Sequence, residues 1–216
     1  MDEAALVSFA RRCLEPVLGE SPEGCFLLAG GTFKSLLHGR PPRDLDLWPS
    51  TPADRERLAA QLVRRGALLL KDHPPYQTSY TFPGQLVELA HDTSVAGLAD
   101  WLQRCDLALS AIGVEHRDGR WRGAIHPQAI ESIRRREVLL LTPLVNWKYA
   151  LATLERLRRY AEELGFGVPR EAEQATWRVF DGQTRAEQNH MIARYLRVCP
   201  GDERILDEAR RRSGSE

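Results

Sequence analysis

The chain has 216 residues, and its 30 Lys and Arg residues balance 30 Asp and Glu residues, so the formal net charge is zero. This length allows one domain with a helical appendage, and zero charge excludes the general basic field of proteins that grip long nucleic acids. Four cysteines without a C-x-x-C pair argue against a zinc site or a disulfide framework. The sequence shows no secretion signal and no apolar run of membrane-spanning length. We therefore expect a soluble, cytoplasmic protein.

The first 125 residues alternate helical and strand patterns. Apolar residues recur at helical spacing near the N-terminus, and Thr51-Pro52 is a typical helix start. Pro83-Gly84 separates two short alternating runs and predicts a hairpin turn. The predicted elements, in chain order, are a helix over Asp2–Leu18, a strand over Phe26–Ala29, a helix over Thr32–His38, a strand over Leu45–Trp48, a helix from Thr51 to Arg65, a strand over Ala67–Leu70, strands over Thr78–Phe82 and Gln85–Ala90, a helix over Val95–Arg104, and strands over Leu107–Glu115 and Trp121–Ala124.

Strand patterns end at His126, and only helical patterns follow. A mixed sheet followed by helices indicates the α+β class, with a small mixed-sheet head over residues 1–125 and a helical C-terminal region over residues 126–216. The predicted helices of this region are Pro127–Arg136, Pro143–Leu164, Arg170–Val179, Thr184–Val198 and Asp202–Arg212.

The most informative stretch of the sequence runs from Cys25 to Trp48. Its first strand ends at Gly30-Gly31, where backbone N–H groups can meet phosphate oxygens without a side chain in the way, and Lys34 follows one helical turn later. Asp44 and Asp46 alternate with leucines, so on a strand both carboxylates point to one face. Such oxygen ligands suit Mg²⁺ or Mn²⁺. A phosphate site beside paired carboxylates indicates phosphoryl or nucleotidyl transfer. The alternatives are a tight strand end and a solvated acidic strand.

Four segments carry a resemblance to a known family. In order along the chain these are Gly30-Gly31-Thr32-Phe33-Lys34-Ser35, Val87-Glu88-Leu89, the segment from Arg104 to Ala111, and Arg159-Tyr160-Ala161-Glu162-Glu163-Leu164-Gly165-Phe166. The pattern resembles the DNA polymerase beta-like nucleotidyltransferase superfamily. Within it, the chain most resembles the head of bacterial poly(A) polymerases and CCA-adding tRNA nucleotidyltransferases.

The resemblance implies an enzyme that moves a nucleoside monophosphate from an NTP to an acceptor hydroxyl and releases pyrophosphate. It implies an RNA 3′ end as the favoured acceptor, with a protein or a small molecule left open. The lack of a long apolar run predicts no membrane partner. Catalysis and binding of Mg²⁺ (or Mn²⁺) would fall to Asp44, Asp46 and Glu88. Nucleotide binding would fall to Gly30, Gly31, Lys34, Arg104 and Asp106.

Two departures from the family pattern narrow this prediction. The family's Arg-Asp after the glycines is Lys34-Ser35 here, so one carboxylate is missing. In CCA-adding enzymes a Glu-Asp-x-x-Arg segment forms hydrogen bonds with the incoming base. At the corresponding position this chain has Tyr149-Ala150-Leu151-Ala152-Thr153, whose side chains cannot form these hydrogen bonds. The resemblance therefore supports nucleotide transfer better than CCA synthesis.

Several alternatives stay open at the level of sequence. Asp92 competes with Glu88 as the third carboxylate. His91-Asp92 also spells the metal dipeptide of HD phosphohydrolases, although no further spaced His and Asp set accompanies it. Arg104 and Asp106 could simply form a helix–strand junction. The whole chain could be a degenerate, non-catalytic member that binds a nucleotide or a protein. The oligomeric state is not predicted.

Overall fold

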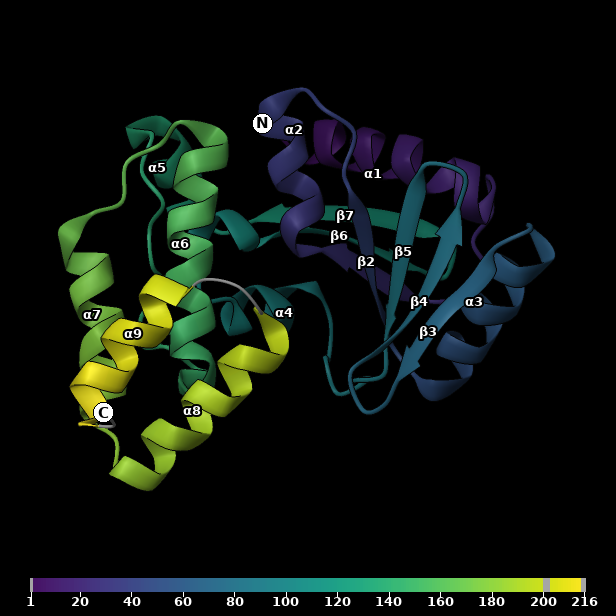
Figure 1. The fold of residues 1–216 in the computed structure, drawn as a ribbon. Coiled ribbons are helices and arrows are strands. Elements are labelled where there is room, and N and C mark those ends of the chain that lie inside the picture. Colours follow the sequence, from purple (N-terminus) through teal and green to yellow (C-terminus); the bar gives the residue numbers. More distant parts are fainter. Residues whose placement is uncertain (1, 200–202, 215–216) are drawn as a thin grey trace. The chain divides into compact units, whose positions relative to one another are not determined.

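The computed structural model describes residues 2–199 and 203–214. The chain forms two compact units, one made of residues 1–103 and 109–129 and the other of residues 104–108 and 130–216. The short segment 104–108 thus packs with the helices that follow it much later in the chain (Figure 1). Each unit is described by itself below.

The first unit is built on a seven-stranded sheet with the order β3-β4-β5-β2-β1-β6-β7. Among the described strands, β2 and β5 form the single parallel pair, and all other neighbours are antiparallel. Strand β3 forms one edge of the sheet, beyond β4 (Figure 1). The strands are β1 (Phe26–Ala29), β2 (Asp44–Pro49), β3 (Leu68–His73), β4 (Gln77–Phe82), β5 (Gln85–Ala90), β6 (Ile112–Arg117) and β7 (Arg120–Ile125).

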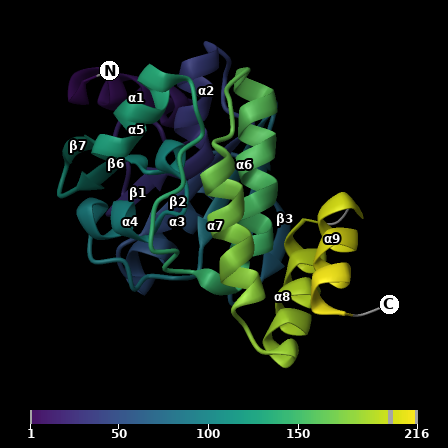
Figure 2. The same cartoon turned by 90° about the vertical axis from the view of Figure 1, so that its left-hand side faces the viewer.

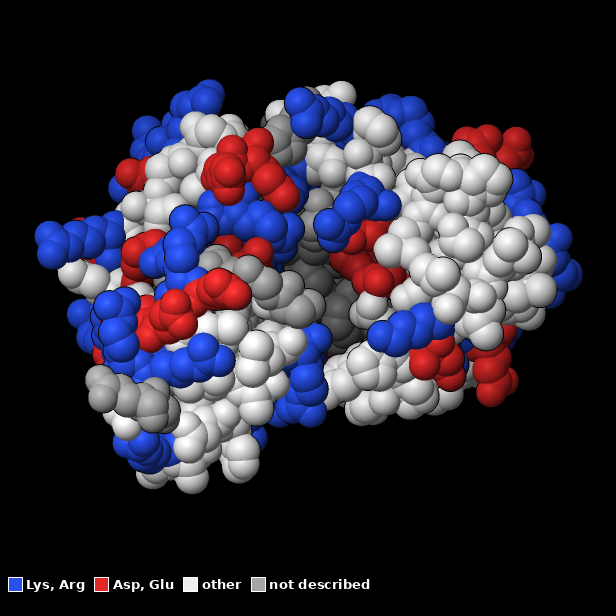
Figure 3. Space-filling model, in the orientation of Figure 1, with Lys and Arg blue, Asp and Glu red and all other residues white. Residues whose placement is uncertain are grey.

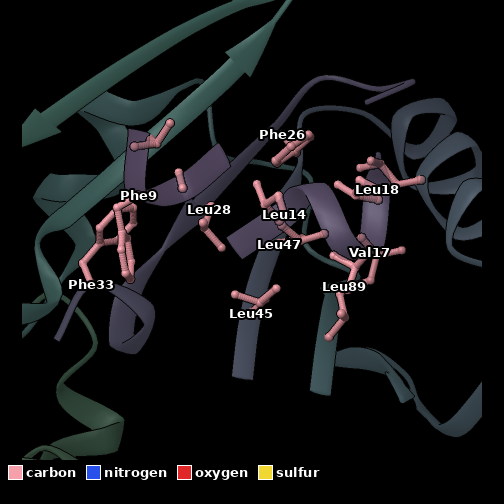
Figure 4. Close-up of a cluster of buried hydrophobic side chains, with 14 of the residues drawn as sticks. Phe9, Leu14, Val17, Leu18, Phe26, Leu28, Phe33, Leu45, Leu47 and Leu89 are labelled. Carbon is pink, nitrogen blue, oxygen red and sulfur yellow. The ribbon is translucent and has the colours of Figure 1, made fainter. Parts of the chain in front are cut away.

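Helices α1 (Glu3–Leu18) and α3 (Pro52–Arg64) contribute to the core of the first unit. Every second residue of the central strands enters this core, among them Leu45, Leu47 and Leu89, which pack with α1 in Figure 4. Because strand side chains alternate between faces, the residues between them lie on the opposite face of the sheet. The other helices here are η1 (Gly30–Phe33), α2 (Lys34–His38), α4 (Leu98–Arg104), η2 (Ala108–Ser110) and α5 (Pro127–Arg135), and α4, η2 and α5 include residues of both units.

The second unit is helical. Helices α6 and α7 lie side by side (Figures 1 and 2) and bury Leu154, Leu157, Trp177 and Phe180. A capping box in which Thr184 and Glu187 exchange hydrogen bonds begins α8. The elements are η3 (Trp147–Tyr149), α6 (Ala150–Leu164), α7 (Arg170–Asp181), α8 (Arg185–Val198) and α9 (Glu203–Ser213). None of the described helices is long and apolar enough to cross a membrane.

The α+β class is confirmed, and the largest errors in the predicted bounds are at the starts of two elements. The strand expected over Leu107–Glu115 begins only at Ile112, after the short helix η2. Residues 107–112 are all buried, and a continuous apolar run does not distinguish a strand from another buried conformation. The helix expected from Pro143 begins at Ala150, because residues before it such as Val145 are exposed and offer no apolar face. Asp202 lies outside the described residues.

Candidate active site

Two of the predicted carboxylates face each other across the sheet. Asp46 on β2 and Glu88 on β5 are direct partners in the parallel pair, and their side chains lie on the face away from the core. The two carboxyl groups share a hydrogen bond, which requires a proton on one of them. Asp44 lies two residues before Asp46 and therefore on the same face. Three acidic groups from two strands are thus gathered at one place.

Burial and the two neighbouring carboxylates raise the pKa of Asp46. Burial, followed by the charges of Asp44 and Glu88, raises the pKa of Asp46 from 3.8 to about 8, and the charge of Arg43 lowers it less. Arg43 forms an ion pair with Asp44 at 2.9 Å, but its own side chain is 84% exposed to solvent. Figure 3 shows acidic side chains gathered over β2, with basic side chains beside them. The charges of Asp44 and Glu88 thus outweigh that of Arg43 in their effect on the pKa of Asp46.

The predicted phosphate turn adjoins these carboxylates. Gly30 has φ of +79°, which favours glycine, and a Cβ on it would lie 3.5 Å from a carboxylate oxygen of Asp46 and 3.9 Å from the Trp101 ring. The hydroxyl of Thr32 donates to the backbone carbonyl of Asp44 at 3.3 Å, which holds the turn against β2. Gly31 lies in η1, and Lys34 begins α2. The structure thus places the glycine turn directly beside Asp46.

The carboxylates of Asp44, Asp46 and Glu88 are the candidate ligands for a metal ion. Within residues 2–199 and 203–214, no group of three or more His, Cys, Asp or Glu side chains is arranged to hold a metal ion. Asp46 shares a hydrogen bond with Glu88, and Asp44 forms an ion pair with Arg43. Three crowded carboxylates with one strongly raised pKa are nevertheless a donor set that a divalent cation with a preference for oxygen would stabilise. Carboxylate oxygens are the type of ligand that Mg²⁺ and Mn²⁺ prefer, and binding of either metal at this cluster stays a prediction.

The rival residues lie elsewhere in the first unit. Asp92 is exposed, and its carboxylate accepts the backbone N–H of Ser94 at 2.8 Å. The Nε2 atom of His91 lies within hydrogen-bond distance of Arg55 and of Asp72, at 3.0 and 3.1 Å. His91 is thus part of a polar cluster beside α3. Of the two candidates for the third carboxylate, Glu88 is the one that contacts Asp46.

The remaining two predicted site residues belong to the second unit. Arg104 ends α4, and Asp106 follows it in the segment that packs with the C-terminal helices. One carboxylate oxygen of Asp106 accepts hydrogen bonds from Thr153 and from Arg156, both on α6. The backbone carbonyl of Asp106 accepts the N–H of Leu141 at 2.7 Å. Asp106 therefore anchors its own segment, and nucleotide binding by Arg104 and Asp106 stays a prediction.

One neighbour of the carboxylates was absent from the predicted site. Ser79 on β4 is the direct partner of Glu88 in the β4–β5 hairpin, and its side chain is buried. Its hydroxyl donates to a carboxylate oxygen of Glu88 at 3.5 Å, at the outer limit of a hydrogen bond. The signal was available in the sequence, because a two-residue turn at Pro83-Gly84 places Ser79 opposite Glu88.

Comparisons with known proteins agree with this architecture. No protein-family model and no curated protein sequence matches the chain. A tRNA-processing enzyme in an apo form matches the whole chain with a TM-score of 0.59 and 18% identity, over 58% of its own length. A tRNA nucleotidyltransferase complexed with a primer tRNA and an incoming ATP analogue matches 88% of the chain with a TM-score of 0.56 and 19% identity, over 58% of its length.

A third solved structure gives the same result. The Thermotoga maritima CCA-adding enzyme, complexed with tRNA, matches the whole chain with a TM-score of 0.57 and 16% identity, over 52% of its own length. The chain thus spans a little over half of each of these proteins. At such identities the likeness establishes the fold, and it bears out the resemblance to the head of tRNA nucleotidyltransferases.

Proposed function

We propose that the protein is a metal-dependent nucleotidyltransferase that moves a nucleoside monophosphate from an NTP to an acceptor hydroxyl, with an RNA 3′ end as the favoured acceptor. The observation that carries the proposal is the contact between Asp46 and Glu88, with Gly30 beside Asp46. This arrangement joins a crowded set of oxygen ligands to a turn suited to phosphate. The fold likeness to proteins solved with tRNA, CTP and an ATP analogue supports the same chemistry.

In the proposed reaction, the acceptor hydroxyl oxygen forms a bond to the α-phosphorus of the NTP. The bond between the α-phosphorus and the bridging oxygen breaks, and pyrophosphate leaves with that oxygen. Glu88 accepts the hydroxyl proton, directly or through water, because it is a carboxylate on the same sheet face as the aspartates. The Gly30-Gly31 turn and Lys34 hold the triphosphate. Positioning and charge neutralisation supply most of the rate enhancement.

Asp44, Asp46 and Glu88 would hold the metal. A bound Mg²⁺ would polarise the phosphate oxygens and offset the charge that develops on pyrophosphate. The chain's own part is to keep three carboxylates on one face, since the strand alternation and the β2–β5 register determine their direction. An acceptor made of RNA and a nucleotide preference unlike that of CCA-adding enzymes both belong to this proposal.

The test is transfer of label from each of the four NTPs to total cell RNA or to protein in the presence of Mg²⁺. We expect wild-type activity, and we expect Asp44→Asn and Asp46→Asn each to retain less than about 1% of it, because each removes a proposed metal ligand. Circular dichroism should show an unchanged fold. Asp92→Asn is the matched control, since it removes an exposed carboxylate outside the cluster.

Two results would contradict the proposal. Substantial activity of either cluster variant in Mg²⁺ would exclude the carboxylates as metal ligands. Binding of an NTP by the wild-type protein without transfer to RNA, protein or small molecules would favour the degenerate, non-catalytic alternative.

A further inference from the structure

A lysine extends the row of acidic residues across the sheet. Asp46 pairs with Glu88, Glu88 pairs with Ser79, and Ser79 pairs with Lys71 on the edge strand β3. Direct partners in a sheet have side chains on the same face. Lys71 therefore lies on the face that carries the carboxylates, with one residue between it and Glu88. Lys71 is not among the predicted site residues.

A β-bulge brings Lys71 to this face. The register of β3 and β4 shifts between Leu69 and Lys71, so that Leu70 is an extra residue without a partner on β4. In an unbroken register Leu70 would lie opposite Ser79, and Lys71 would point to the core face. Bulges redirect side chains in this way and are frequent beside active sites. The neighbouring Asp72 agrees with this assignment, because it accepts a hydrogen bond at 2.6 Å from Thr78, which is buried on the core side.

The Lys71 side chain is available to a ligand. Lys71 is exposed, and its ammonium forms no ion pair or hydrogen bond within the described residues. Figure 3 shows charged side chains of both signs at the lower end of β3 and an uncharged surface above them. Neighbouring strands lie about 4.8 Å apart, and the four-carbon stem of a lysine is long enough to pass over the one small residue between it and Glu88.

The geometry of the proposed reaction places the NTP and the acceptor on opposite sides of the carboxylates. In an in-line displacement the attacking oxygen and the leaving pyrophosphate lie on opposite sides of the phosphorus atom. The glycine turn lies at Asp46 on the β1 side, whereas Glu88, Ser79 and Lys71 lie on the β5–β4–β3 side. A triphosphate over Gly30-Gly31 leaves the Lys71 side to the acceptor.

We infer that Lys71 binds a backbone phosphate of the acceptor's terminal nucleotides and so orients a polynucleotide 3′ end toward Glu88. The inference rests on the proposed function and adds a residue and a ligand class to it. The acceptor class that this contact favours is a nucleic acid 3′ end, whose backbone phosphates lie close to the attacking hydroxyl. Lys71 holds the substrate, and Glu88 performs the chemistry.

The test compares Lys71→Ala, Lys71→Arg and the wild type in binding a short fluorescein-labelled single-stranded RNA, measured by anisotropy over a range of salt concentrations. We expect Lys71→Ala to weaken binding by up to about fivefold, because exposed ion pairs contribute little more than that. We expect it to lower the slope of log K against log salt by about 0.7, the loss of one phosphate contact. Lys71→Arg should restore both values.

Steady-state kinetics provides a second readout. The KM for RNA should rise in Lys71→Ala, while the KM for NTP and the thermal stabilisation by NTP stay unchanged. Arg11→Ala is the matched control, since it removes the same charge from an exposed position of α1, whose helix packs on the other face of the sheet.

Three outcomes would overturn the inference. Unchanged RNA affinity and salt slope in Lys71→Ala would exclude the phosphate contact. A rise in the KM for NTP instead would place Lys71 on the triphosphate. Wild-type transfer to a protein or small molecule without RNA binding would overturn the inference and the RNA acceptor, and it would leave nucleotidyl transfer by this site intact. Absence of NTP binding and of transfer would overturn the proposed function itself.

Discussion

At the residue scale, Asp46 is a carboxyl group that the fold keeps protonated near neutral pH. Its pKa is raised to about 8 by burial and by the charges of Asp44 and Glu88, and its proton is shared with Glu88. Without a bound cation, an ionised Asp46 would be repelled by the neighbouring carboxylates that raise its pKa. The arrangement therefore favours ligand binding over stability, as is common at functional sites.

Asp46→Asn should stabilise the metal-free protein, and increasingly so at higher pH. The unfolded Asp46 releases its proton near pH 3.8, whereas the folded one keeps it to about pH 8. The unfolded state therefore binds fewer protons between these values, and the free energy of unfolding falls with rising pH by at most about 1.4 kcal/mol per unit from this group. Asparagine abolishes this loss.

Thermal melts of the two proteins in EDTA between pH 5 and pH 8 measure the effect, and Asp92→Asn is again the control. The gain in melting temperature should be larger at pH 8 than at pH 5. A difference that is constant over this range would show that Asp46 is ionised throughout.

The sequence predicted which residues share a face within a strand, but not which strands meet. Alternation of Asp44 and Asp46 with leucines follows from strand geometry alone. The contact of Asp46 with Glu88 depends on the parallel pairing of β2 with β5, which joins distant segments and which only the family resemblance suggested. Two aspartates were thus accessible to physical reasoning, and Glu88 was not.

At the scale of elements, local turn chemistry predicted some registers and missed others. The turn at Pro83-Gly84 implies that Ser79 lies opposite Glu88, and the structure has this pairing. The bulge at Leu70 could not be foreseen, because a single extra residue in an exposed edge strand leaves no mark in the apolar pattern. One extra residue determines which face Lys71 occupies.

The N-terminus of α3 offers an element-scale prediction. Asp54 is buried there, and its carboxylate accepts hydrogen bonds from the Cys25 N–H at 2.9 Å, from the Thr51 hydroxyl and from Arg57 at 2.6 Å. Burial alone would raise the pKa of Asp54, but these donors together lower it below 3.8. The carboxylate thus ties α3 to the residue that precedes β1.

Asp54→Asn should lower the free energy of unfolding by about 1–3 kcal/mol at pH 7, because the charged hydrogen bonds are lost. Because the folded pKa is lowered, this contribution is present above the unfolded pKa of about 3.9 and disappears as the pH falls through the folded value. Urea unfolding at pH 7 and pH 3 measures it. Glu56→Gln, at an exposed position of the same helix, should have little effect. An equal loss for Asp54→Asn at both pH values would contradict a charge-dependent role.

At the scale of the whole molecule, the balance of positive and negative charge limits the electrostatic affinity for nucleic acid. With 30 basic and 30 acidic residues, a long electrostatic footprint is not expected. Each contacted phosphate adds about 0.7–0.9 to the slope of log K against log salt, so a few contacts predict a slope of magnitude about 2–4 for an RNA end. Anisotropy titrations between low and physiological salt would measure it. A slope typical of dedicated nucleic-acid binders would reveal a concentrated basic surface.

The parallel pairing of β2 with β5 also bears on how the molecule acquires its function as it folds. The β4–β5 and β6–β7 hairpins join strands that are adjacent in the chain, so their contacts close short loops. Asp46 and Glu88 are 88 − 46 = 42 residues apart in the sequence. The ribosome must therefore synthesise α3, β3 and β4 before β5 exists to pair with β2. Contacts of high sequence separation cost more loop-closure entropy than those of a hairpin. During synthesis the chain therefore emerges without its acidic cluster, and the carboxylates meet only when β5 has docked against β2.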